Sequence, residues 1–171
     1  MKTKLSIIAA LFAFTLGISA QTTSASSKEF KHGIGLAAGA TSGYGLSYQY
    51  FPEKVGVQLI FGGIKYESDI NLSLGLILKY EIIENQKANL YLYQSNSLYY
   101  SKYEYEGYDY DTGQSSGRTI EKDYTINNGF GVGTDISMGK RLSLNVMGGV
   151  GSYDILQIIT VTGEVAVFYR I

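Results

Sequence analysis

After its first twenty residues, the chain divides into eight short stretches in which an apolar residue alternates with a small or polar one. A period of two is typical of β-strands whose two faces meet different surroundings. The stretches span residues 33–41, 43–51, 55–66, 72–83, 89–105, 124–138, 141–153 and 158–171. The alternation is ambiguous in two of them, and the fifth cannot be phased, because Leu90 and Leu92 favour one face while Gln94 and Asn96 lie on that same face. The pattern predicts an all-β protein with eight strands.

The first twenty residues have the layout of a cleaved secretory signal peptide. Lys2 and Lys4 precede an apolar run over residues 5–17, and Ala20 stands before the expected cleavage site. The run is too short for a membrane-spanning helix. We therefore expect residues 1–20 to be the leader, 21–31 a flexible periplasmic lead-in, and 32–171 one folded domain.

Composition narrows the function classes. The chain has 21 glycines, 16 tyrosines, one proline and no cysteine, so no disulfide framework is available. Without Lys2 and Lys4, 12 basic residues face 15 acidic ones, which gives no support to nucleic-acid binding. After the leader, no apolar stretch is long enough for a transmembrane helix.

The two faces of the strands favour a membrane barrel over a soluble sheet. One face is apolar and, in the well-phased strands, uncharged, as a lipid-facing surface must be. The other is rich in glycine and carries a few charges, which suits the narrow interior of an eight-stranded barrel. Those inward charges are Lys79, Glu81, Asp135, Glu164 and Arg170. We interpret them as a paired lumen network that plugs the barrel, because buried charges must be paired.

Aromatic placement and loop lengths give the barrel a direction. If odd strands run outward, one group of aromatics falls near the periplasmic edge and another near the outer edge, as interfacial girdles do. The first group is Tyr50, Phe51, Tyr80, Tyr91, Tyr93 and Tyr169; the second is Tyr44, Tyr66, Tyr99, Tyr100 and Tyr153. The connections after the second, fourth and sixth strands are short, and the long loop expected over residues 106–123 falls outside the cell.

The last strand carries the sharpest motif. Glu164, Ala166, Tyr169 and Ile171 resemble the C-terminal signal read by the barrel-assembly machinery, although Ala166 replaces the usual glycine and Ile171 the usual phenylalanine. With this strand, residues 32–171 resemble the small OmpA/OmpX-type outer-membrane barrels. The resemblance implies an antiparallel up-and-down transmembrane barrel in the bacterial outer membrane, in contact with its lipid and lipopolysaccharide. The resemblance implies a cellular location more than it implies an activity.

The most distinctive local segment is the Tyr/Asp-rich sequence over residues 99–111. Tyrosine supplies contact area at a low entropic cost, so the segment could bind an extracellular partner. The alternative is a strand extension whose tyrosines and acids only pack and meet water. The binding candidates are Tyr103, Tyr105, Tyr108, Asp109, Tyr110 and Asp111. Asp109, Asp111 and Gly113 lack the later glutamate of a calcium loop, so we expect no metal.

The remaining motifs indicate no reaction. His32, the only histidine, starts the first strand, away from the outer-leaflet position that a lipid-modifying barrel hydrolase needs. The glycines at 129, 131 and 133 lie within a strand and open no helix, so they are no nucleotide fingerprint. We expect a monomeric, non-enzymatic barrel without a cofactor, structural or adhesive in role. A barrel enzyme acting on lipid A and a secreted soluble β-sandwich or lipocalin-like binder remain the alternatives.

Overall fold

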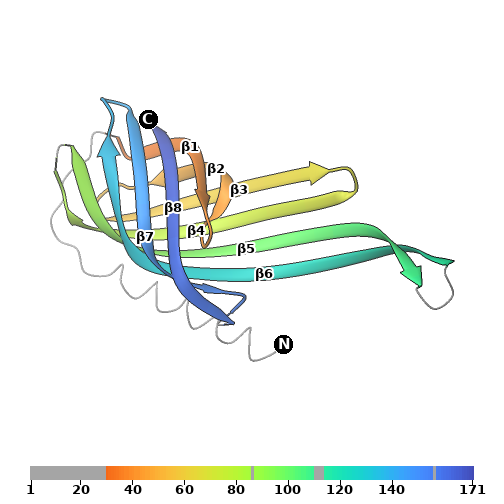
Figure 1. Ribbon diagram of the computed structural model, residues 1–171. Helices are drawn as coiled ribbons and strands as arrows, with labels where there is room; N and C mark the ends of the chain where they lie inside the picture. Colours follow the sequence, from red (N-terminus) through yellow and green to blue (C-terminus); the bar gives the residue numbers. More distant parts are fainter. Residues whose placement is uncertain (1–29, 86, 110–113, 156) are drawn as a thin grey trace.

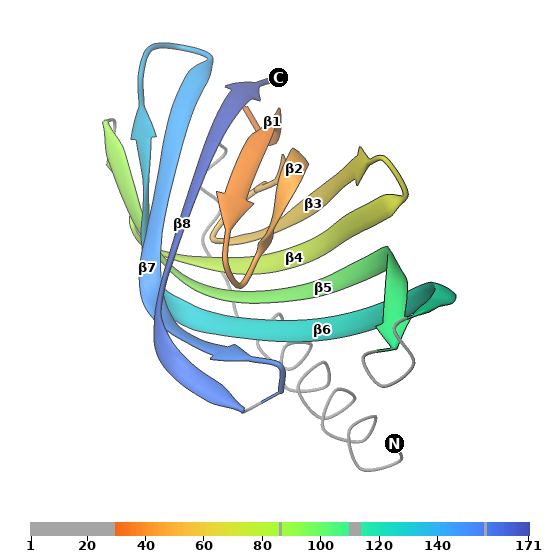
Figure 2. The ribbon, with the colours of Figure 1, turned by 45° about the vertical axis from the view of Figure 1, so that its right-hand side comes forward.

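The computed structural model describes residues 30–171 apart from 86, 110–113 and 156, and gives only the backbone of 105–109 and 114–116. Eight antiparallel strands close into one barrel in chain order, as Figures 1 and 2 show. They are β1 (His32–Gly39), β2 (Gly43–Tyr50), β3 (Val55–Tyr66), β4 (Asp69–Ile83), β5 (Ala88–Asp109), β6 (Gln114–Ser137), β7 (Leu142–Tyr153) and β8 (Ile158–Arg170). The predicted eight-stranded up-and-down barrel is confirmed.

The register fixes the slope of the strands. Starting at Leu36 of β1 and following paired residues through β2 to β5, the path reaches β6 at Ile126. Following them through β8 and β7, it reaches β6 at Ile136. The two arrival points lie ten residues apart on one strand, and this stagger inclines the strands by about 40° to the barrel axis. The geometry is that of a narrow barrel whose interior side chains can fill.

The two ends of the barrel differ. At the terminal end, where β1 starts and β8 finishes, short turns cover residues 51–54, 84–87 and 138–141. At the opposite, distal end the hairpins reach different heights (Figure 1). The β1–β2 hairpin is short, since its last pair with β8 is Gly39–Glu164, whereas β3–β4 and above all β5–β6 extend further.

The expected long loop over residues 106–123 is wrong. Strand β5 continues to Asp109 and β6 begins at Gln114, and the two stay paired from Ala88–Ile136 to Asp109–Gln114. Beyond Lys102, β4 no longer accompanies β5, and β7 leaves β6 beyond Asn128. The segment is therefore a two-stranded ribbon that projects from the wall, with a register shift at Gly107/Tyr108.

The two faces of the wall follow the predicted alternation. In β4, for example, Ser73 and Ile77 are buried inside while Leu72 and Leu74 are exposed outside. The open phase of the fifth strand is settled: Tyr91 points inward, and Gln94 and Asn96 share the outer face with Leu92. Among the described residues, nine buried side chains are hydrophobic and sixteen are polar or charged. The interior is therefore more polar than the exterior.

Candidate functional site

The outer surface carries a continuous apolar band, which we call the outer belt. It consists of the outward-facing residues within 34–38, 44–50, 55–61, 72–80, 90–98, 126–136, 142–150 and 161–169. Leucine, valine, isoleucine and phenylalanine dominate it: Leu36, Leu46 and Phe61, for example, are each more than 60% exposed. None of these outward positions is Asp, Glu, Lys or Arg. Because all eight strands contribute outward-facing residues, the belt encircles the barrel.

Three amides interrupt the belt, and two hydrogen bonds to one oxygen join them. Asn128 of β6 donates from Nδ2 to Oδ1 of Asn96 at 2.7 Å, and Nε2 of Gln94 lies 3.4 Å from the same oxygen. A polar group in an apolar setting costs least when it is hydrogen-bonded. This pairing explains how amides occupy the outer face, which the sequence pattern alone could not reconcile.

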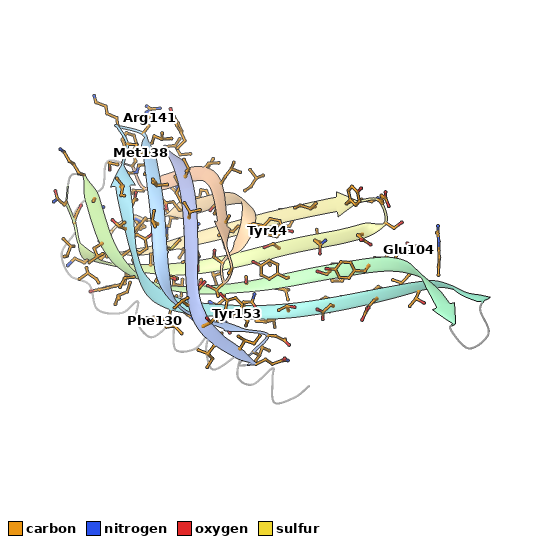
Figure 3. All side chains as sticks on the ribbon, viewed as in Figure 1. Tyr44, Glu104, Phe130, Met138, Arg141 and Tyr153 are labelled. Carbon is orange, nitrogen blue, oxygen red and sulfur yellow. The ribbon has the colours of Figure 1, made fainter. Side chains whose placement is uncertain are left out.

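Aromatic side chains border the belt at both ends, although not all of those predicted. At the terminal end, His32 stacks against Tyr50 with ring centroids 4.9 Å apart, and Tyr169 contacts Arg141. At the distal end, Tyr100 and Tyr124 stack at 4.9 Å. Figure 3 places Arg141 at the β6–β7 turn and Glu104 far out on β5.

Six predicted girdle aromatics lie on the inner side of the wall instead. Tyr66 and Tyr153 share the strand parity of the buried Gly62 and Gly151. Tyr91 and Tyr93 are buried within the lumen, and Phe51 is buried at its terminal mouth. Tyr99 donates its hydroxyl to the carbonyl of Gly39 at 3.1 Å, inside the distal half of the barrel. For Tyr91, Tyr93 and Tyr99, the sequence left the phase of the fifth strand open, which is why the girdle prediction included them.

The five charges predicted for the lumen all point inward, but the structure distributes them among separate clusters. At the terminal mouth, Arg170 forms an ion pair with Asp135 at 2.9 Å and donates to Ser137 at 3.0 Å. Lys79, deeper in, is 2% exposed. It donates to Oδ1 of Asn145 at 2.8 Å and lies over the Tyr91 ring at 5.0 Å.

Glu164 is held in the distal half of the lumen by hydroxyl groups. Its Oε1 accepts from Thr41 at 2.7 Å and from Ser95 at 3.0 Å. Glu81 is buried at 4% exposure on β4, two residues beyond Lys79. Three neutral residues, Asn145, Thr41 and Ser95, thus organise the charged ones, and no local motif in the sequence marks them.

The turn between β1 and β2 closes the lumen. Thr41 and Ser42 are fully buried, and Thr41 reaches across the barrel to Ser95 of β5 at 2.9 Å. Asn127 of β6 donates to the carbonyl of Ala40 at 3.1 Å. We call residues 40–42 the plug turn. Its contacts with β5, β6 and β8 span the interior, so the turn blocks the lumen.

Two glycines on the wall make room for the plug turn. A Cβ added to Gly75 of β4 would lie 1.7 Å from the carbonyl oxygen of Ser42, and one added to Gly129 of β6 would lie 2.2 Å from Oγ1 of Thr41. Both are closer than atoms can approach. The glycine-rich inner face is therefore a steric requirement of the plug turn as well as of the narrow lumen.

A cavity of about 340 Å³ opens at the terminal mouth. Its lining includes Phe51, Asn89, Asp135 and Arg170. Because Lys79, Tyr91 and Phe168 pack together directly behind this region, the cavity is a shallow vestibule.

The Tyr/Asp-rich binding candidates lie on the projecting ribbon or beyond the described residues. Tyr103 is 43% exposed and pairs with Glu121 across the ribbon. Tyr105, Tyr108 and Asp109 are strand residues of β5 by their backbone. Tyr110 and Asp111, like Gly113, fall outside the described residues, and so do residues 1–20 and most of the 21–31 lead-in. The strand-extension alternative describes the backbone of this segment.

The other sequence candidates also have defined places. His32 lies on the outer face, where its Nδ1 is 2.7 Å from the Tyr48 hydroxyl. Within the described residues, no group of three His, Cys, Asp or Glu side chains could hold a metal ion, and no helix there is long and apolar enough to cross a membrane. Of the assembly-signal residues, Glu164 and Ala166 face the lumen, whereas Tyr169 and Ile171 are exposed.

Comparisons with known proteins return little. No family model matches the chain, and no curated protein matches it. Among solved structures it is similar to the N-terminal β-barrel domain of OprF from Pseudomonas aeruginosa, with a TM-score of 0.47 and 14% identity over 82% of this chain and 95% of that one. The fold described here rests on the strand pairing of this chain.

Proposed function

We propose that the protein is an integral outer-membrane β-barrel, non-enzymatic and non-conducting, which anchors the β5–β6 ribbon at the cell surface in a structural or adhesive role. One observation carries the proposal: an uncharged apolar belt surrounds a polar, charged interior. Only a closed barrel or a helix satisfies every backbone hydrogen bond while facing lipid. The secretory leader expected at residues 1–20 supplies the export route.

The inverted polarity argues against a soluble binder. A soluble barrel of the lipocalin-like kind would place its apolar residues inside, around a ligand, and polar ones outside. Here the lumen holds Lys79, Glu81, Asp135 and Glu164, while Leu36, Phe61 and Phe130 are exposed. Side chains of this size gain free energy only when they leave water, and a lipid bilayer is the surrounding that provides this.

The packed interior supports the absence of conductance. The plug turn fills the distal half of the lumen, and the Lys79 cluster fills the half nearer the termini. Eight strands leave room for side chains but for no water-filled channel. In planar bilayers, the purified protein should therefore produce no stable channel steps, and steady ohmic conductance would contradict this part of the proposal.

The outward position of His32 supports a non-enzymatic role. A lipid A-modifying barrel enzyme needs its histidine beside a serine and an acid. His32 instead contacts Tyr48 and Tyr50 on the outer surface at the terminal end. If His32→Ala abolished a lipid A modification seen by mass spectrometry, the enzyme alternative would return.

Fractionation and gel mobility test the location. In the intact organism, the protein should sediment with outer membranes, resist carbonate extraction and migrate faster on gels when unheated than when boiled. Recovery in the soluble periplasm without detergent would overturn the proposal. Adhesion is tested separately, by comparing surface binding of cells carrying the full ribbon with cells carrying a shortened one.

A further inference from the structure

We propose that Lys65, Lys102 and Lys122 form a binding site for the phosphate groups of an outer-leaflet lipid, at the level where the belt ends. The inference rests on the proposed membrane location and adds a specific lipid contact to it. The site lies on the outward face of β3, β5 and β6, just below the projecting ribbon.

Strand register brings the three lysines into one row. Lys65 pairs with Ile70, Ile70 pairs with Lys102, and Lys102 pairs with Lys122, so the row crosses β3, β4, β5 and β6 without a gap. The parity of each strand sends all four side chains outward. With strands about 4.8 Å apart, the three spacings from β3 to β6 place the backbones of Lys65 and Lys122 about 14 Å apart, within reach of one bound lipid for their long side chains.

The row sits at the boundary of the apolar belt. One step nearer the barrel on the same face lies the row Leu72, Tyr100 and Tyr124, in which the two tyrosines stack. Two residues along a strand span about 6.6 Å. Tyrosines gather at the membrane interface, so the lysines lie where headgroups begin.

Both faces of this part of the sheet carry charged residues. The inner face carries Asp69, Glu121 and Asp123, whereas the outer face carries the three lysines together with Glu104 and Arg118. Asp69 and Asp123 are engaged by backbone amides, those of Glu104 and Tyr124. The outer ion pair between Arg118 and Glu104 lies further out along the ribbon. None of the three lysines has an ion-pair partner among the described residues.

The position of Lys102 directly opposite Lys122 also indicates an anion-binding site. Like charges directly opposite one another on a strand pair are destabilising. An anion between them removes that repulsion, and phosphate accepts hydrogen bonds from several ammonium groups at once. At this height, a phosphorylated lipid headgroup is the anion in reach, and its acyl chains would lie along Leu72, Tyr100 and Tyr124.

The test uses the folded protein in zwitterionic detergent micelles and diphosphoryl lipid A as the probe, with bound lipid counted by native mass spectrometry. The test variant is Lys65→Gln/Lys102→Gln/Lys122→Gln. The matched control, Lys54→Gln/Lys87→Gln/Lys140→Gln, removes the same charge from the terminal end. A third variant with arginine at positions 65, 102 and 122 keeps the charge.

The wild type should bind the phosphorylated lipid more tightly than the same lipid without phosphates. Loss of affinity should be about fivefold for each lysine removed, with little change in the terminal-end control and retention in the arginine variant. Equal affinity in the test variant and wild type would overturn the proposal, as would an equal loss in the control.

Two further measurements distinguish the possible reasons for a negative result. If inorganic phosphate at millimolar concentration broadens its ³¹P resonance on the wild type and displaces the lipid, a free ion is the ligand and the lipid proposal is wrong. Heat-modifiable mobility is measured first on every variant. A wild type that lacks it would refute the membrane location itself, whereas intact mobility with unaltered lipid binding refutes only the lysine site.

Discussion

Replacing one belt residue by arginine gives the sharpest test of the membrane proposal. Val132 lies on the outer face of β6 within the belt and is 51% exposed. Ile120 lies on the same face of the same strand, twelve residues nearer the ribbon tip, and is 54% exposed. At 3.3 Å per residue and a tilt of about 40°, their heights differ by about 30 Å, which is the thickness of a bilayer core.

Under the proposed membrane location, residue 132 faces lipid and residue 120 faces water, while the strand, the face and the exposure of the two positions are matched. Val132→Arg should lower the free energy of unfolding by about 2–4 kcal/mol, the cost of arginine near the bilayer midplane. Ile120→Arg should change it by less than about 0.5 kcal/mol, as at an ordinary water-exposed site. Arginine itself is not the cause of the difference, because both variants carry it.

The assay is reversible guanidinium unfolding in phosphatidylcholine vesicles, followed by far-ultraviolet circular dichroism because the chain has no tryptophan. Equal slopes of free energy against denaturant confirm that the variants unfold from comparable states. If Val132→Arg and Ile120→Arg cost the same within error, water reaches both sites and the lipid-facing belt is refuted.

Three further perturbations probe the lumen and the ribbon. Gly75→Ala should destabilise the barrel by about 1–3 kcal/mol because its Cβ would overlap the Ser42 carbonyl, while Gly148→Ala, whose Cβ meets nothing closer than 4.0 Å, should be near neutral in the same unfolding assay. Asp135→Asn should cost less than the about 3–5 kcal/mol of a fully buried pair, because the Arg170 side chain retains 17% exposure at the mouth, and adding Arg170→Gln should restore part of the loss. Replacing residues 104–120 by Asn-Gly, a turn suited to the facing Tyr103 and Glu121, should leave heat-modifiable mobility intact and remove any surface binding; loss of mobility would show that the ribbon stabilises the barrel.

The sequence predicts the barrel wall well because one face of each strand meets one environment. The bounds of β3 match the predicted 55–66, and the inward and outward sets of β1, β2, β4, β6, β7 and β8 follow the alternation. A residue that faces lipid must be apolar and uncharged, so the constraint repeats at every second position. The inward orientation of the five predicted lumen charges follows from the same parity.

The interior contacts could not be read in this way. The plug turn joins Thr41 to Ser95 and Glu164, which lie 54 and 123 residues away along the chain. Their meeting depends on strand tilt and on the shortness of the β1–β2 hairpin, neither of which leaves a local signal. The phase of β5 could not be predicted for a different reason. Asn96 lies on the outer face, where Asn128 hydrogen-bonds it across the strand pair. A sequence pattern scores each residue singly and does not detect such a pair.

The ribbon begins where the alternation of apolar and polar residues ends. Beyond the belt, both faces of β5 and β6 meet water, so apolar alternation disappears and the segment resembles a loop. On β6, Glu121 and Asp123 take the inner face and Lys122 between them takes the outer one, whereas on β5 Lys102 and Glu104 share the outer face. Under the proposed membrane location, the outer face at the height of the lysine row meets the phosphate layer. The lysine site therefore requires that the belt faces lipid, whereas a lipid-facing belt does not require the lysine site.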